Sequence, residues 1–155
     1  TGLIVLAKHA LSAAFLSQAM RSREIHRTYQ AFALGETAAS GTIDAPIARL
    51  DGSLIQRTVD FASGERSVTH YRTLAHCSGF SHLELSLETG RTHQIRVHMA
   101  YIGHPLLGDT LYNKTPGTFP RQALHSASLS FIHPITGEPL NFHAPLPEDM
   151  QNLLT

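Results

Sequence analysis

The sequence predicts an α+β fold, with a largely antiparallel mixed sheet and about three flanking helices. Hydrophobic residues make up 42% of the chain and charged residues 15%, which is typical of a globular protein. Several segments alternate apolar and polar residues, the period of a half-buried strand, whereas few show helical spacing. A chain of 155 residues can bury a substantial core, so we expect residues 1–155 to form one domain.

The first third of the chain predicts a strand, a helix and a second strand. Residues 2–7 form a short, continuously apolar run, which indicates a strand. Residues 9–21 place apolar side chains at helical spacing, and residues 26–34 alternate until Gly35 ends the strand. The apolar positions of the predicted helix are Leu11, Ala14, Phe15 and Ala19.

The middle of the chain predicts an antiparallel meander of three strands. Residues 38–41 are small and indicate a loop before it. Ser63-Gly64 and Ser78-Gly79 are turn signals that separate the strands, which we expect to pair as hairpins. The three strands are expected at residues 56–61, 68–76 and 80–88, and Leu83, Leu85 and Leu87 give the last of them one dry face.

The last third predicts a helix, an ordered loop, a hairpin and a terminal helix. Thr89-Gly90 breaks the preceding strand, and Thr92 is a candidate cap for a helix that runs to about Ile102. Glycine and proline recur throughout the loop that follows this helix. The later segments are the loop at residues 103–121, paired strands at residues 124–132 and 140–143, and a helix at residues 147–154.

Charge is balanced over the chain but segregated along it. Twelve basic residues offset twelve acidic ones, a net charge of zero that by itself argues against a nucleic-acid binder. Residues 1–35 and 89–125 each carry four basic residues and one acidic residue. Residues 36–88 carry four basic and seven acidic residues, and residues 126–155 carry three acidic residues only. If the two basic segments fold together, they form a positive face for phosphates; ordinary solvated surface is the alternative.

A single cysteine, Cys77, excludes an intramolecular disulfide framework and a cysteine-rich zinc site. Its context predicts a small residue at the end of a strand rather than a nucleophile. The longest apolar run is too short to span a bilayer, so we expect a cytoplasmic protein.

The densest chemistry lies at residues 89–98, where two arginines, two histidines and a glutamine surround a strand-to-helix turn. On this helix Ile95, Met99 and Ile102 are expected to face the core. Arg96 lies beside these buried positions and needs an anionic partner, either a carboxylate or a phosphate. No acid of this chain stands out as that partner, and a structural ion pair remains an equal alternative.

Other chemistries find little support. Eleven histidines suggest a metal site, yet His93 and His98 are poorly spaced on a helix and no H-E-x-x-H motif exists. The chain also lacks a G-x-S-x-G elbow and a P-loop. Tyr29, beside Arg27 on an alternating strand, fits either the core or stacking on a base.

Four ordered motifs together resemble the RluA/RluD-type RNA pseudouridine synthases over essentially the whole chain. The longest is TGRTHQIRVHMAYIGHPLLG at residues 89–108, which continues through Asp109 to Tyr112. The others are an R-x-Y-x-A…G strand at residues 27–35, R-Q-A-L-H at residues 121–125 and H-A-P-x-P at residues 143–147.

This resemblance implies a pseudouridine synthase fold and isomerisation of uridine in structured RNA. Relatives act on large-subunit ribosomal RNA, which we expect here, or on transfer RNA. The family's catalytic aspartate lies in an H-R-L-D-x-x-[ST]-[ST]-G-L motif, of which Thr1-Gly2-Leu3 matches only the end. We therefore expect the aspartate, and any S4-type RNA-binding domain, to precede Thr1, and this chain alone to be inactive. A non-catalytic RNA-binding relative remains an alternative.

The resemblance also implies residue roles. Arg96 would pair with the upstream aspartate, and Tyr29 would lie against the nucleoside as a candidate general base. Leu124 would form an apolar wall of the pocket, with Ile95 supporting it. No metal or organic cofactor is implied, and a monomer is expected. The predicted phosphate contacts are Arg91, Arg21, Arg23 and Lys8.

Overall fold

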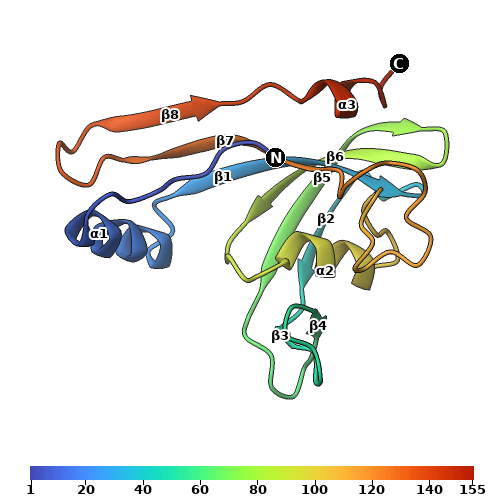
Figure 1. Ribbon diagram of the computed structural model, residues 1–155, viewed down its shortest axis with the longest axis horizontal. Coiled ribbons are helices and arrows are strands. Elements are labelled where there is room, and N and C mark those ends of the chain that lie inside the picture. Colours follow the sequence, from blue (N-terminus) through green and yellow to red (C-terminus); the bar gives the residue numbers. More distant parts are fainter. The chain divides into compact units, whose positions relative to one another are not determined.

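The computed structural model describes residues 1–155, which divide into two compact units (Figure 1). Unit 1 comprises residues 1–29 and 125–155, and unit 2 comprises residues 30–124. Strand β1 (His26–Leu34) begins in unit 1 and ends in unit 2. Helices and mainly antiparallel strands occur together, which confirms the predicted α+β class.

Unit 2 contains a sheet in which the strand order is β2-β5-β6-β1. Strand β5 (Val68–Cys77) pairs with β2 (Ser40–Asp44) on one side and with β6 (Phe80–Leu87) on the other. The β5–β6 hairpin turns at Gly79, whose φ of 84° suits glycine, as the sequence predicts. Cys77 ends β5, also as predicted.

The predicted three-strand meander is wrong in its first strand. Strand β4 (Arg57–Val59) pairs with β3 (Ile47–Arg49) in a separate two-stranded ribbon and not with β5. Strand β2 and β3 were both missed, because their five and three residues carry too little alternation to be recognised. Instead of joining β4 to β5 as a hairpin, Gly64 packs on the start of β3, where an added Cβ would lie 2.8 Å from the Pro46 carbonyl carbon.

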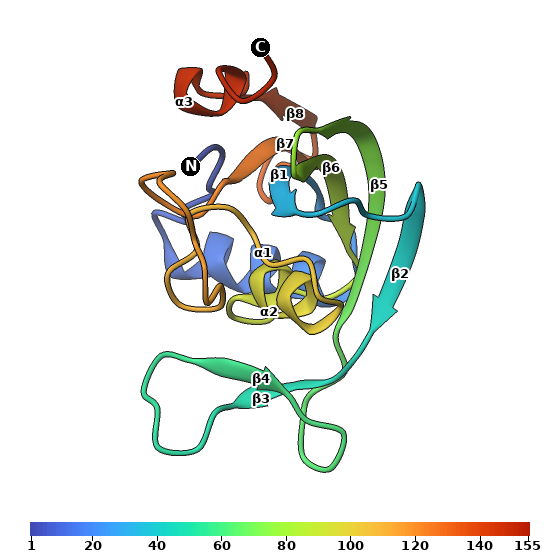
Figure 2. The same cartoon turned by 90° about the vertical axis from the view of Figure 1, so that its right-hand side faces the viewer.

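Helix α2 (Gln94–Tyr101) lies beside β5 and the β3–β4 ribbon (Figure 2). The predicted cap at Thr92 is wrong, because the N-cap is His93, in the left-handed region with φ 59°. No side chain caps the helix; the Gln94 side chain instead accepts the Arg91 backbone N–H of the preceding turn. Ile95 and Met99 are buried, as predicted for the core face of this helix.

The core of unit 2 forms between the sheet and the segments that cover it. Phe32 on β1 is fully buried and stacks on the ring of His82 at 4.6 Å between centroids. The predicted ordered loop at residues 103–121 contributes buried side chains to this unit, including those of Leu106 and Asp109. Other large buried residues of the unit include Leu83, Leu85, Met99 and Val68.

Unit 1 contains helix α1 (Ala10–Arg21), strands β7 (Leu124–Ile132) and β8 (Pro139–His143), and helix α3 (Glu148–Gln151). Strands β7 and β8 form the predicted terminal hairpin. The core of unit 1 includes Ile25, Leu129 and Phe131. The half-buried side chains packed against them are those of Leu3, Val5, Leu16, Ala19 and Leu140.

Three predictions for unit 1 need correction. Residues 2–7 form no strand: Gly2 makes a single parallel bridge to Ser126, and Ile4 and Leu6 are exposed. In α1 the face in contact with the core carries Leu16 and Ala19, whereas Leu11 and Phe15, two of the predicted apolar positions, are exposed. Helix α3 is a single turn, shorter than predicted. No helix of the structure is both long and apolar enough to cross a bilayer.

Candidate functional site

Arg96 and Asp109 form a bidentate ion pair in unit 2. The Arg96 Nε–H donates to Asp109 Oδ2 and Nη2 donates to Oδ1, each over 2.7 Å. The Asp109 side chain is fully buried and that of Arg96 is 13% exposed. The expectation that no acid of this chain would stand out as a partner is therefore wrong.

This pair uses only one edge of the guanidinium group. The two hydrogen bonds of the Arg96 side chain come from Nε and Nη2, and both go to Asp109. Nη1 has no acceptor within the chain. A guanidinium carries five N–H donors, so a second anion can bind at the remaining edge. The arrangement is thus a structural ion pair that leaves N–H donors of the guanidinium unused.

Both charges of the pair are stabilised. Burial alone would raise the pKa of Asp109, but Arg96 and the backbone N–H groups of Leu111 and Tyr112 lower it below its usual value. The hydrogen bond to Asp109 raises the pKa of Arg96. Asp109 is thus a carboxylate and Arg96 a cation throughout the neutral range.

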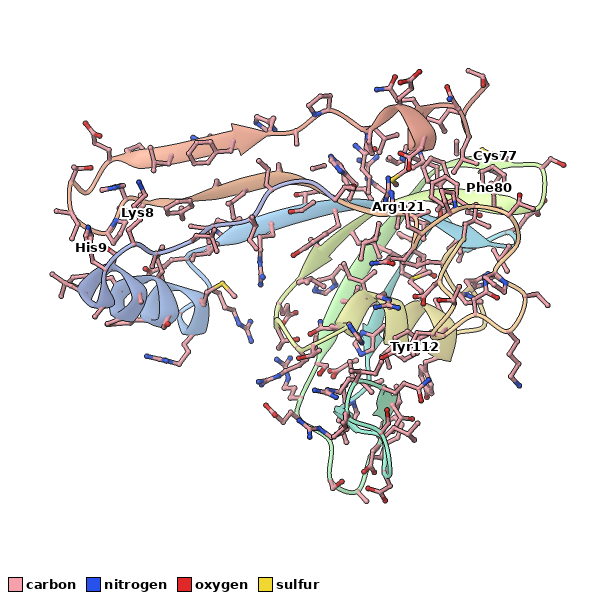
Figure 3. All side chains as sticks on the ribbon, in the orientation of Figure 1. Lys8, His9, Cys77, Phe80, Tyr112 and Arg121 are labelled. Atoms are coloured by element: carbon pink, nitrogen blue, oxygen red, sulfur yellow. The ribbon has the colours of Figure 1, made fainter.

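Tyr112 lies near α2 and the β3–β4 ribbon (Figure 3). It contacts Arg96 and Arg57. The Arg96 guanidinium carbon lies 5.0 Å from the Tyr112 ring centroid, within cation–π range. The Tyr112 hydroxyl accepts the Arg57 backbone N–H at 2.9 Å and lies 2.8 Å from His93 Nδ1. Burial, followed by the charges of Arg96 and Arg57, lowers the pKa of His93, so a neutral Nδ1 can accept the hydroxyl proton.

A second network fixes the turn that carries Arg96. The Gln94 amide is buried and donates to the Val68 carbonyl and to Thr69 Oγ1. Its oxygen accepts from the Thr89 hydroxyl at 2.8 Å and from the Arg91 N–H at 3.0 Å. The four bonds satisfy every donor and acceptor of the amide and hold the start of α2 against β5.

His98 continues this network into the core as a structural residue. Its fully buried ring bonds Thr69 Oγ1 at 2.9 Å and the Ala45 carbonyl at 2.8 Å. Burial lowers the pKa of His98, so the ring is neutral, with Nε2 donating to Ala45 and Nδ1 accepting from Thr69. Within residues 89–98, Thr89, Gln94 and His98 therefore hold the fold, which leaves Arg91 and Arg96 on its outer side.

The other predicted site residues of unit 2 occupy different environments. Ile95 is buried in the core, which fits a supporting role. Arg91 is exposed and pairs with Glu65 at 2.5 Å, a partner that the phosphate prediction did not include. Leu124 is half-buried at the start of β7. The structure therefore brings Arg96 together with Asp109, Tyr112 and His93, and not with Arg91.

The predicted site residues of unit 1 lie on β1 and around α1. Tyr29 is half-buried near the middle of β1, and its hydroxyl has no hydrogen-bond partner within the chain. Lys8, Arg21 and Arg23 are exposed, and Arg23 adopts φ 61° just beyond the helix. Tyr29 and Arg96 belong to different units, so their predicted meeting at one site stays a prediction.

Asp109, Tyr112 and His93 were not identified as functional residues from the sequence. Asp109 and Tyr112 fall at the end of the long motif, and that position was the one available signal. The structure contains no group of three or more histidine, cysteine or carboxylate side chains placed to hold a metal ion.

Comparisons with known proteins point to one family. Residues 1–101 match the family model described as RNA pseudouridylate synthase. The chain is 49% identical, over 99% of its length, to an uncharacterized RNA pseudouridine synthase, YjbO, of Bacillus subtilis (strain 168). It is 46% identical, over 97% of its length, to the ribosomal large subunit pseudouridine synthase D of Vibrio cholerae.

The chain spans about half the length of these two relatives, 54% and 50% respectively. Among solved structures, human RNA pseudouridylate synthase domain containing 1 matches with a TM-score of 0.75 at 27% identity. That match covers 90% of this chain and 62% of the human one, so the fold expected from the sequence is confirmed.

Proposed function

The chain belongs to the RNA pseudouridylate synthase family, and on that basis we propose that it is the greater part of a catalytic domain that isomerises uridine to pseudouridine in RNA. The observation that carries the proposal is Arg96, a buried cation within the family's long motif that keeps one guanidinium edge for a second anion. We assign that edge to a catalytic carboxylate, which acts as the nucleophile or helps to form a glycal.

In this proposal Asp109 positions Arg96, and Arg96 positions the nucleophile. The bidentate pair fixes the guanidinium plane, and its outer edge then holds the catalytic aspartate ionised and oriented. The proposal assigns that aspartate to a residue before Thr1, so residues 1–155 alone are expected to be inactive. Asp109 is already committed to four hydrogen bonds, which disfavours it as the nucleophile.

Tyr29 is assigned the general base. The reaction breaks the bond between N1 of uracil and C1′ of the ribose, and C5 of the rotated base then bonds C1′; N1 gains a proton, C5 loses one, and a proton taken from the sugar returns to it. A hydroxyl without a partner in the protein, on a half-buried strand, is suited to contact the nucleoside and accept a sugar proton. The target base has to leave its stack to reach such a pocket.

Large-subunit ribosomal RNA is the proposed substrate, because similar proteins carry that substrate in their names. A ribosomal RNA substrate agrees with the cytoplasmic location that we expect. Lys8, Arg21 and Arg23 are exposed cations of unit 1 that we assign to the phosphate backbone, together with Arg91 of unit 2.

The test is an isomerisation assay with a protein extended upstream of Thr1. Large-subunit ribosomal RNA and transfer RNA transcripts are incubated separately, and pseudouridine is mapped by mass spectrometry after derivatisation. Arg96→Ala is expected to lower the rate at least about 100-fold, because it releases the nucleophile from its orientation. Tyr29→Phe, which removes only the hydroxyl, is expected to cost about 100-fold to 10,000-fold.

Arg72→Ala is the matched control, since Arg72 is exposed and pairs with Glu84 on the neighbouring strand. Wild-type rates in both Arg96→Ala and Tyr29→Phe would contradict the proposal. Isomerisation of transfer RNA alone would replace ribosomal RNA with transfer RNA as the proposed substrate. RNA binding without isomerisation would favour a non-catalytic RNA-binding relative.

A further inference from the structure

We propose that the face formed by α2 and β4 binds a single-stranded nucleotide of the RNA, apart from the uridine that reacts. Its base stacks on Phe61 or Tyr101, and its phosphates bind Arg49 and Arg57. The inference rests on the proposed function for its ligand, RNA, but on separate residues for its site.

The first observation is a shallow groove with exposed aromatic rings. Its volume is about 350 Å³, and its lining includes Arg57, Phe61, Val97, Tyr101 and Tyr112. Phe61 is 70% exposed and Tyr101 is 53% exposed, although both are large aromatic side chains. Exposed rings in an RNA-binding family are suited to stacking on bases, since every base has a π-face.

The arrangement of the two rings favours one stacked base. Their centroids lie 6.5 Å apart and their planes are inclined by 56°. This tilt excludes a parallel sandwich and leaves room for a base to stack on one ring with its edge against the other. The Tyr101 hydroxyl has no partner within the chain and is available to a base or phosphate.

Phe61 is held in place by its turn. The Asp60 carboxylate accepts the N–H groups of Ala62 and Ser63 and the Ser63 hydroxyl, and the Gly64 N–H donates to the Asp60 carbonyl at 3.0 Å. An added Cβ at Gly64 would lie 2.4 Å from that carbonyl oxygen, so the turn requires glycine. An exposed ring on a fixed backbone loses little entropy when it binds.

The second observation is a polar pocket that shares Arg57 with the groove. Its volume is about 410 Å³, and Arg49, Arg57, Arg91 and Glu65 contribute to its lining. Glu65 is paired with Arg91, whereas the guanidinium groups of Arg49 and Arg57 have no carboxylate partner. The pocket therefore carries two unneutralised positive charges, which complement a phosphate backbone.

The two pockets and the site around Arg96, Asp109 and Tyr112 form one continuous path. Tyr112 lines the aromatic groove, bonds the Arg57 N–H and lies under the Arg96 guanidinium. A strand bound at Phe61 and Tyr101 thus runs toward Arg96. RNA recognition commonly uses unpaired nucleotides whose bases stack on aromatic side chains.

The test measures binding of the 155-residue chain to a fluorescein-labelled single-stranded RNA of about ten nucleotides with a central 2-aminopurine. Stacking is expected to quench the 2-aminopurine on binding. Phe61→Ala and Tyr101→Ala are each expected to weaken binding about 5-fold to 100-fold and to relieve the quenching. Arg49→Ala and Arg57→Ala are each expected to reduce the slope of log affinity against log salt by about 0.7.

Matched controls separate stacking from hydrophobic contact and from unfolding. Phe61→Leu keeps an apolar side chain but no ring and is expected to bind as weakly as Phe61→Ala. Leu54→Ala removes an 85% exposed apolar side chain outside both pockets, and it is expected to bind as the wild type does. Circular dichroism verifies the fold of each variant.

Wild-type affinity and quenching in Phe61→Ala and Tyr101→Ala would overturn the inference, as would wild-type behaviour of Phe61→Leu. Isomerisation that still depends on Arg96 in the extended protein would then leave the proposed function standing. Conversely, binding that depends on the two rings, without isomerisation of any RNA by the extended protein, would support the nucleotide site and contradict the proposed function.

Discussion

At the scale of single residues, the polar side chains of the long motif have two separate roles. Thr89 and Gln94 hydrogen-bond each other and the Val68 backbone, and His98 bonds Thr69 and the Ala45 carbonyl. Arg96 forms a largely buried ion pair with Asp109. The polar residues within residues 89–98 are therefore not interchangeable: Thr89, Gln94 and His98 stabilise the fold, whereas Arg96 pairs with Asp109 and keeps donors for the anion that we propose it binds.

Asp109→Asn is expected to destabilise the chain by about 3–5 kcal/mol, because it leaves the Arg96 cation largely buried and unpaired. Urea unfolding at pH 7 measures this change, with Asp51→Asn at an exposed position as control. The lowered pKa of Asp109 means that its contribution is complete above about pH 4 and is lost as the pH falls further. The difference in unfolding free energy between Asp109→Asn and the wild type should therefore shrink as the pH falls below about 4. A difference that stays constant would contradict the assignment.

His98 predicts a second pH dependence. Because its pKa is lowered on folding, the unfolded chain binds more protons, and stability falls as the pH drops below about 6.5 toward the folded pKa. His98→Gln keeps a donor for the Ala45 carbonyl and removes this titration. The slope of unfolding free energy against pH should decrease by up to about 1.4 kcal/mol per pH unit below pH 6.5. An unchanged slope would show that His98 does not titrate on unfolding, and His9→Gln is the exposed control.

At the scale of elements, the loop at residues 103–121 positions the anion partner of Arg96. Gly108 precedes Asp109, adopts φ 66° and packs so closely on the chain that an added Cβ would lie 1.9 Å from the Arg121 carbonyl oxygen. The Asn113 side chain donates to the Leu106 carbonyl and closes the loop on itself. Asp109 is thus held by backbone geometry as well as by its charge.

Gly108→Ala is expected to cost more than about 3 kcal/mol, because the new methyl group collides with backbone atoms that cannot rotate away. Gly117→Ala in the same loop is the matched comparison, since its φ is 74° but nothing lies within 4 Å of an added Cβ. That variant should cost only about 1 kcal/mol, the strain of the left-handed backbone. Thermal unfolding of both variants checks the difference, and equal costs would exclude the collision as the cause.

At the scale of the whole molecule, a net charge of zero does not describe what an RNA encounters. Arg49 and Arg57 have no carboxylate partner, and Arg96 keeps N–H donors that Asp109 does not use, whereas Glu84 and Glu88 lie in ion pairs elsewhere. Association with RNA depends on such local charges rather than on their sum.

Binding of the chain to a structured RNA fragment is therefore expected to weaken steeply with salt, with a log–log slope of about −2 or steeper. Replacing Lys8 or Arg21 by alanine should each reduce the slope by about 0.9, the value for one duplex phosphate contact. Arg72→Ala should leave it unchanged, because Arg72 already pairs with Glu84. Fluorescence anisotropy at several salt concentrations measures these slopes, and a flat dependence would rule out phosphate-driven binding.

The family, the α+β class and the elements with a local pattern could be predicted from the amino-acid sequence: α1, β1, the β5–β6 hairpin and the β7–β8 hairpin. Alternation and turn chemistry are properties of neighbouring residues, so they can be read along the chain. The pairing of β4 with β3, the Asp109 partner of Arg96, and the groove at Phe61 and Tyr101 came from the folded chain alone. Each joins residues that lie between 8 and 40 positions apart, and such contacts depend on how the backbone folds back on itself, which no local pattern encodes.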